Sequence, residues 1–152
     1  MKMQAKHYRG LAVMSLLSFG AMYVLMYAMV DRFGNVYSNV NQFYMAALMA
    51  APMAVIELLV MWEMYDNWRA NFAIIGGSLA LLALAFLAIR VQAGVADKQF
   101  LRSMIPHHAG AILMCEQASV TDPDILALCK DILSGQRREI DQMRAKLAAL
   151  GG

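Results

Sequence analysis

Hydrophobic residues fill long runs in the first 90 positions, whereas in the last third they recur at intervals of three and four. Residues 10–30 and 72–89 contain no charge, and residues 43–62 contain only Glu57. A helix needs about 20 apolar residues to cross a bilayer. None of these runs has the polar face that a helix of a soluble bundle shows. The pattern therefore predicts three membrane spans near residues 10–30, 43–62 and 72–89.

Composition supports this division into an apolar part and a charged tail. The chain is 61% hydrophobic and 16% charged, against about 45–50% and 25% in soluble domains. A net charge of +2 offers no large basic field for nucleic acid. The sequence contains no glycine-rich phosphate loop, no nucleophile elbow and no nucleophile–base pair. We therefore expect neither an enzyme nor an organic cofactor.

Lysine and arginine set the expected orientation, since they favour the cytoplasmic side. Lys2, Lys6 and Arg9 precede the first span, and each loop holds a single arginine. The first run is longer than the 7–15 residues, roughly, of a signal-peptide core and lacks an A-x-A site, so it is expected to stay attached. Because three spans put the chain ends on opposite sides, we predict a bacterial inner-membrane protein with its amino terminus inside and its tail in the periplasm.

The second span carries a stripe of methionines and one carboxylate. Met45, Met49, Met53, Glu57 and Met61 are spaced by four residues and share a helix face. An ionisable residue deep in a span points to function, and thioethers suit Cu(I), so one interpretation is an accessory to metal transport. The alternative is a flexible packing seam in which a protonated Glu57 bonds to a neighbouring helix.

After a linker at residues 91–96, the spacing becomes that of two amphipathic helices within residues 97–150. Asp97 is the expected cap of the first helix. Asp122 followed by Pro123 marks the start of the second, with the aspartate as cap and the proline at the first helical position. The chain is therefore predicted to be all-α, with three transmembrane helices followed by an antiparallel helical hairpin.

Facing positions in such a hairpin have residue numbers with a nearly constant sum, about 244 here. We expect His108 to face Gln136, and Met104 to face Glu139 or Ile140. Buried polar groups are costly without a partner or a role. This polar layer is therefore a candidate site.

The same register places Cys115 opposite Cys129. A disulfide suits an oxidising compartment, although its Cα atoms must lie within about 6.8 Å, which is tight for helices whose axes are 8–10 Å apart. The disulfide is favoured, and a free thiol pair or thiolate metal ligands remain open.

Soft-metal ligands gather in the first helix of the tail: Met104, His107, His108, Met114 and Cys115. Imidazole and thioether together suit copper in either oxidation state. The alternative is a buried histidine pair that bonds to Gln136 and Glu139 and fixes the helix register.

Residues 97–114 (DKQFLRSMIPHHAGAILM) and 132–143 (ILSGQRREIDQM) resemble the domain of unknown function 305. The resemblance implies a ferritin-like helical domain, usually exported, with some members linked to copper binding and tolerance. It implies a metal-facing set of Met104, His107, His108 and Met114, faced by Gln136, Glu139 and Met143. Cys115 departs from the pattern, since the family often has a small residue there.

Together these features predict a membrane-anchored protein that binds copper outside the cytoplasm, for sequestration or for hand-off to a metal-handling partner. The competing prediction is a structural or interaction module without metal. A hairpin of about 50 residues cannot bury a sufficient core alone. We therefore expect it to form a homo-oligomer, completing a ferritin-like four-helix bundle, or to pack on the spans.

Overall fold

The computed structural model describes residues 2–151, with side chains from residue 5 onward, so the Lys2 charge used above lies outside the described side chains. Every regular element in this part of the chain is helical, which confirms the all-α prediction. The elements form two compact units. One holds the three apolar helices, and the other combines Met26–Val40 with the chain from Gly94 onward.

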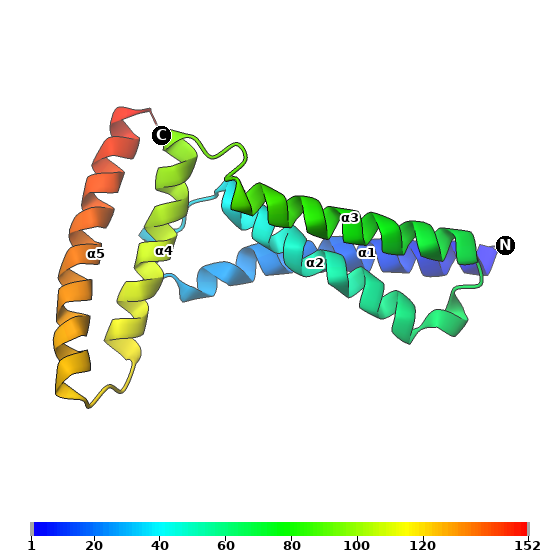
Figure 1. Ribbon diagram of the computed structural model, residues 1–152, viewed down its shortest axis with the longest axis horizontal. Coiled ribbons are helices and arrows are strands. Elements are labelled where there is room, and N and C mark those ends of the chain that lie inside the picture. Colours follow the sequence, from blue (N-terminus) through cyan, green and yellow to red (C-terminus); the bar gives the residue numbers. More distant parts are fainter. Residues whose placement is uncertain (1, 152) are drawn as a thin grey trace. The chain divides into compact units, whose positions relative to one another are not determined.

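The first unit contains α1 (Lys2–Leu25), α2 (Val40–Val60) and α3 (Trp68–Arg90) (Figure 1). Three segments, Ala5–Met29, Val40–Val60 and Trp68–Arg90, are long and apolar enough to cross a membrane, which confirms the three predicted spans. The first ends in a short 3₁₀ turn, Met26–Met29, and another, Trp62–Met64, follows α2.

The buried face of α2 consists of five alanines and Leu58. Ala46, Ala47, Ala50, Ala51 and Ala54 are buried, whereas Met45, Met49 and Met61 are exposed. Small side chains let apolar helices approach closely, and Ala54 and Leu58 pack with Leu11 of α1. Most of the methionine stripe thus lies away from the alanine face, whereas Met53 and Glu57 are half-buried.

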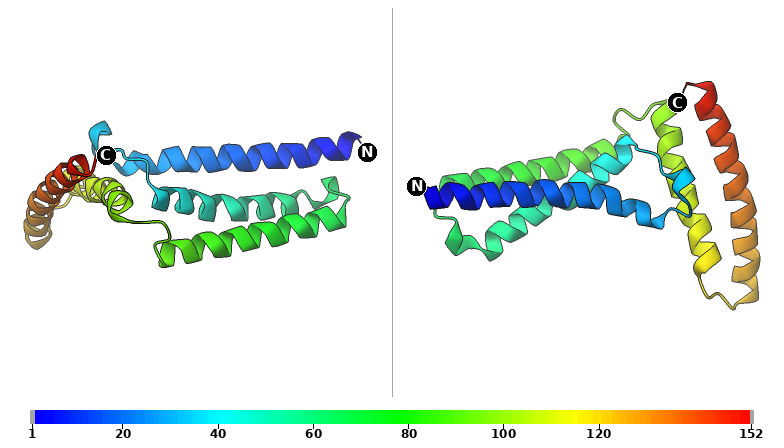
Figure 2. Two further views of the ribbon diagram at one scale, coloured as in Figure 1. Left: turned by 90° about the horizontal axis from the view of Figure 1, so that it is seen from above. Right: turned by 180° about the vertical axis from the view of Figure 1, so that it is seen from behind.

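The second unit is built on α4 (Asp97–Gln117) and α5 (Pro123–Ala149), which lie side by side and antiparallel (Figures 1 and 2). Asp122 caps α5 as predicted, because its carboxylate accepts hydrogen bonds from the amides of Asp124 (2.9 Å) and Ile125 (3.1 Å). The expected cap of α4 is wrong. Ala96 occupies that position and Asp97 lies in the first turn, where a carboxylate complements the helix dipole.

The segment between the first two spans belongs to this second unit, which the sequence pattern did not predict. It contains the 3₁₀ turn Phe33–Asn35. Val30 and Tyr37 pack against the hairpin core of Leu101, Ile105, Ala109, Ile112, Ile140 and Leu147. Arg144 of α5 donates hydrogen bonds to the Gly34 carbonyl (2.7 Å) and to Asn35 Oδ1 (2.6 Å). The hairpin thus gains part of its missing core from Met26–Val40.

Candidate functional site between α4 and α5

His108 is the buried polar centre of the hairpin, with 9% of its surface exposed. Its Nδ1 lies 2.9 Å from the backbone carbonyl of Met104, one turn earlier in α4. A carbonyl only accepts, so Nδ1 carries a proton and Nε2 points away as the second polar atom of the ring. Nε2 lies 2.9 Å from Glu139 Oε2 on α5, so a hydrogen bond joins the two helices at this point.

The contact with Glu139 replaces the predicted contact with Gln136, which is half-buried. Residue numbers of contacting positions sum to 244 at Cys115–Cys129, 247 at His108–Glu139 and 249 at Lys98–Gly151. Glu116 and Arg137 also form a contact, and their numbers sum to 253. Side chains of different length therefore meet at different sums, so no single value predicts the partner of a residue.

Carried one turn along the hairpin, the sum of 247 at His108 assigns Met143 as the position opposite Met104. Met143 packs against the hairpin core, and Met104 is half-buried. We call Met104, His108, Glu139 and Met143 the His–Met layer. By residue type it contains one imidazole, one carboxylate and two thioethers, and His108 and Glu139 are the pair whose contact is described above.

The other predicted ligands lie outside this layer. The His107 side chain is exposed, with its ring centre 6.0 Å from that of His108, and Met114 is exposed as well. Cys115 is bonded to Cys129. Within residues 2–151, no three His, Cys, Asp or Glu side chains gather around one point as a metal site would require. A metal in the His–Met layer would therefore depend on thioether sulfur.

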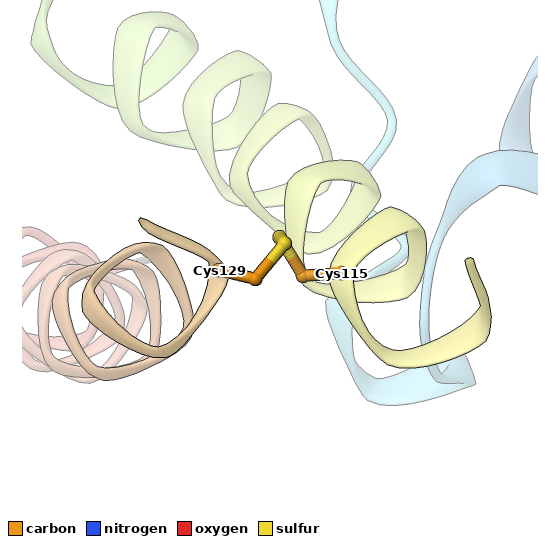
Figure 3. The surroundings of a disulfide bond; sticks show 2 residues. All are labelled: Cys115 and Cys129. Carbon is orange, nitrogen blue, oxygen red and sulfur yellow. A yellow bond between two sulfur atoms is a disulfide. The ribbon is translucent and has the colours of Figure 1, made fainter. Parts of the chain in front are cut away.

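The disulfide joins α4 and α5 near the turn between them (Figure 3). The Cα atoms of Cys115 and Cys129 are 5.4 Å apart, within the usual range for a disulfide. The short turn brings the two helices together at this point. The predicted difficulty of bridging two packed helices therefore does not arise.

A second polar cluster lies in the first unit, where the sequence had singled out only Glu57. Glu57 lies three residues before the end of α2, not deep in the span, and its Oε1 accepts a hydrogen bond from the Tyr65 hydroxyl at 3.4 Å. Burial, together with the Glu57 carboxylate, raises the pKa of Tyr65 above its usual value of 10.0, so this hydroxyl keeps its proton.

Tyr8 and Asn71 complete this cluster. The Tyr8 hydroxyl donates to Asn71 Oδ1 at 2.7 Å, and the Asn71 amide donates to the Tyr65 carbonyl at 2.8 Å. An asparagine at the start of an apolar run was the signal available in the sequence. These hydrogen bonds give Glu57 and its neighbours a structural role within the first unit.

Comparison with known proteins places the chain in a family. Residues 84–147 match the family described as domain of unknown function DUF305, which covers α4, most of α5 and the end of α3. The chain therefore carries a DUF305 domain. An uncharacterized protein of Acanthamoeba polyphaga mimivirus is 33% identical over 138 residues, which cover 89% of each chain. No solved structure matches.

The viral relative extends the likeness beyond the DUF305 match. An alignment of 138 residues is more than twice as long as the matched segment and must include much of the apolar part. The similarity to this relative therefore extends into the apolar part of the chain.

Proposed function

We propose that the protein is a membrane-anchored copper-binding protein that holds Cu(I) in the His–Met layer outside the cytoplasm, for sequestration or hand-off. The observation that carries this proposal is the orientation of His108. Because the Met104 carbonyl takes the Nδ1 proton, Nε2 is the nitrogen available to a metal, which is the usual arrangement of a ligating histidine.

The two polar ligands lie close enough to share a metal ion. Nitrogen and oxygen ligands lie about 2.0–2.2 Å from a bound ion, so two of them at a tetrahedral angle are about 3.3–3.6 Å apart. His108 Nε2 and Glu139 Oε2 are 2.9 Å apart, the distance of a hydrogen bond. An ion can take the place of this hydrogen bond when the two atoms separate by about half an ångström. The thioethers of Met104 and Met143 add the soft donors that favour Cu(I).

The disulfide supports an extracytoplasmic hairpin, since such bonds persist in oxidising compartments. The second unit gives independent support. It combines the segment between the first two spans with the tail after the third, and three crossings put these two segments on the same side of a bilayer. The exposed apolar side chains Met114, Ile125, Leu126 and Leu128 offer a surface for the second copy that completes the bundle.

Titration with Cu(I) against a chromophoric competitor tests the proposal on the disulfide-bonded, full-length protein in detergent. The Met104→Leu/Met143→Leu variant should lose at least tenfold in affinity, and His108→Ala should lose more. Met114→Leu and His107→Gln are matched controls outside the layer and should bind like the wild type. Equal binding by the wild type and the layer variants, or loss in the controls alone, would reject the His–Met layer.

A second candidate function is a structural module in which His108 and Glu139 lock α4 against α5 without a metal. The specific observation in its favour is that both nitrogens of His108 already have partners. The two functions differ in their response to metal. Cu(I) should raise the melting temperature of the wild type but not of Met104→Leu/Met143→Leu if the layer binds copper, and should raise neither if the layer is only structural.

A further inference from the structure

The Cys115–Cys129 pair lies seven residues along α4 from His108 and takes no part in the His–Met layer. We propose that this pair is a second, redox-gated copper site. As a disulfide it holds no metal, and as a dithiol it binds one Cu(I) through both sulfurs. The cysteine site would bind copper in addition to the His–Met layer, and it does not depend on copper binding in that layer.

The two cysteines are held close together by more than their own bond. Residues 118–122 connect α4 and α5 directly beyond them. Glu116, next to Cys115 on α4, pairs with Arg137 in the middle of α5 at 2.5 Å. Ile112, one turn before Cys115, is part of the hairpin core. These contacts keep the helices together after reduction, so the two thiols remain neighbours.

The chemistry of two adjacent thiols fits Cu(I). Thiolate is a soft ligand that selects Cu(I). Two metal–sulfur bonds of about 2.3 Å each place the sulfurs up to about 4.6 Å apart. The Cα atoms are 5.4 Å apart, so rotation about the two Cα–Cβ bonds can provide this spacing without moving the helices. The metal-bound and disulfide states exclude each other, because both use the same two sulfur atoms.

Both cysteines are half-buried, so a reductant and a metal donor can reach them from solvent. Met114, next to Cys115, is exposed. Exposed disulfides are the ones that exchange with thiols, in contrast to fully enclosed structural bridges. The partial exposure of the two cysteines thus favours a disulfide that can be reduced and re-formed.

The gating step is a thiol–disulfide exchange. A thiolate of a dithiol reductant attacks one sulfur of the bridge, the Cys115–Cys129 bond breaks and a mixed disulfide forms. The second thiol of the reductant then attacks the mixed disulfide and releases the remaining cysteine as a thiol. Two electrons and two protons pass to the cysteines, and the reductant becomes a disulfide. Cu(I) then displaces the two thiol protons without changing its oxidation state. Oxidation by a disulfide of the same class re-forms the bridge and releases Cu(I).

The test compares the oxidised full-length protein with protein reduced by a phosphine, which contains no competing thiol and is removed before titration. Cu(I) bound per chain is measured against a chromophoric competitor, and the near-ultraviolet thiolate-to-copper absorption is recorded. The reduced protein should bind one equivalent more than the oxidised protein and show the absorption band. Circular dichroism should show that the helices survive reduction.

Two variants separate this site from the His–Met layer. Met104→Leu/Met143→Leu should keep the additional equivalent and the band, whatever happens to the first site. Cys115→Ser/Cys129→Ser should lose both and retain the binding of the oxidised wild type. Alkylation of the reduced wild-type protein provides the same comparison without a substitution, should the serine variant misfold.

Equal Cu(I) binding by the oxidised and reduced proteins would overturn the proposal. So would an additional equivalent that persists after alkylation, since it would then come from other groups. Loss of helix on reduction would also overturn it, because the two thiols would no longer be held together.

Discussion

His108 is the residue on which both candidate functions depend, because each of its nitrogens has one partner and only one of these partners can be exchanged. The bond from Nδ1 to the Met104 carbonyl lies within one helix turn and orients the ring. The bond from Nε2 to Glu139 crosses between helices. A metal would compete with the second bond and leave the first intact.

Removing the carboxylate tests the second bond in the absence of metal. Glu139→Ala should lower the free energy of unfolding of the hairpin by about 1 kcal/mol. A hydrogen bond to a charged group contributes more to stability than one between neutral groups, but partial exposure to solvent reduces this contribution. Almost half of the Glu139 side chain surface, 47%, is exposed. Chemical denaturation in a chelating buffer measures the change. Glu139→Gln keeps a polar group at this position and should cost less, and equal stability of all three proteins would contradict the bond.

Arg144 is the residue that ties the segment Met26–Val40 to α5. Arg144→Lys should loosen this segment, because a single ammonium cannot reproduce the placement of the guanidinium against Gly34 and Asn35. Hydrogen exchange of the amides of residues 31–39 should become faster. Arg138→Lys, at an exposed position of the same helix, is the control and should leave exchange unchanged. Unchanged exchange in both variants would show that the segment is held by other contacts.

At the scale of the elements, the start of α5 offers a clean test because one side chain caps it. Asp122→Ala removes the acceptor for the amides of Asp124 and Ile125 and should destabilise the hairpin by about 1 kcal/mol. Asp122→Asn keeps an acceptor oxygen and should lose only a fraction of this. Thermal melts followed by circular dichroism measure both, and equal melting temperatures for Asn and Ala variants would argue against the cap.

The elements themselves were predictable from the sequence because each is determined by local signals. Long apolar runs gave the spans, and Asp122-Pro123 gave the start of α5. The partner of His108 was not predictable to better than one turn. Side chains meet at different sums along the hairpin, so a constant sum assigns Gln136 where the structure has Glu139. The candidate residues could be named from the sequence, but not which of them are in contact.

The packing of Met26–Val40 on the hairpin could not be predicted either. This segment has no hydrophobic period, and its two buried side chains, Asn35 and Asn39, are polar. Their burial depends on hydrogen bonds to distant positions such as Arg144 and Ser103. Without knowledge of these hydrogen bonds, the sequence of a polar segment between two spans predicts an exposed loop.

At the scale of the whole molecule, the proposed orientation makes the two cysteines accessible from outside. In spheroplasts of a bacterial host, treatment with an impermeant phosphine and then an impermeant maleimide should label Cys115 and Cys129. A cysteine introduced at Asp66, between the second and third spans, in a Cys115→Ser/Cys129→Ser background should react only after lysis. The reverse result would place the hairpin in the cytoplasm.

The chain enters the second unit twice, once between the first two spans and once after the third. The hairpin is therefore not an independently transferable domain, although it follows the third span in the sequence. A truncation after residue 93 would leave Val30 and Tyr37 without the core that they pack against. A hairpin grafted onto an unrelated anchor would in turn lack both of these residues and the partners of Arg144. Transfer of function to another membrane protein would thus require Met26–Val40 as well as the hairpin.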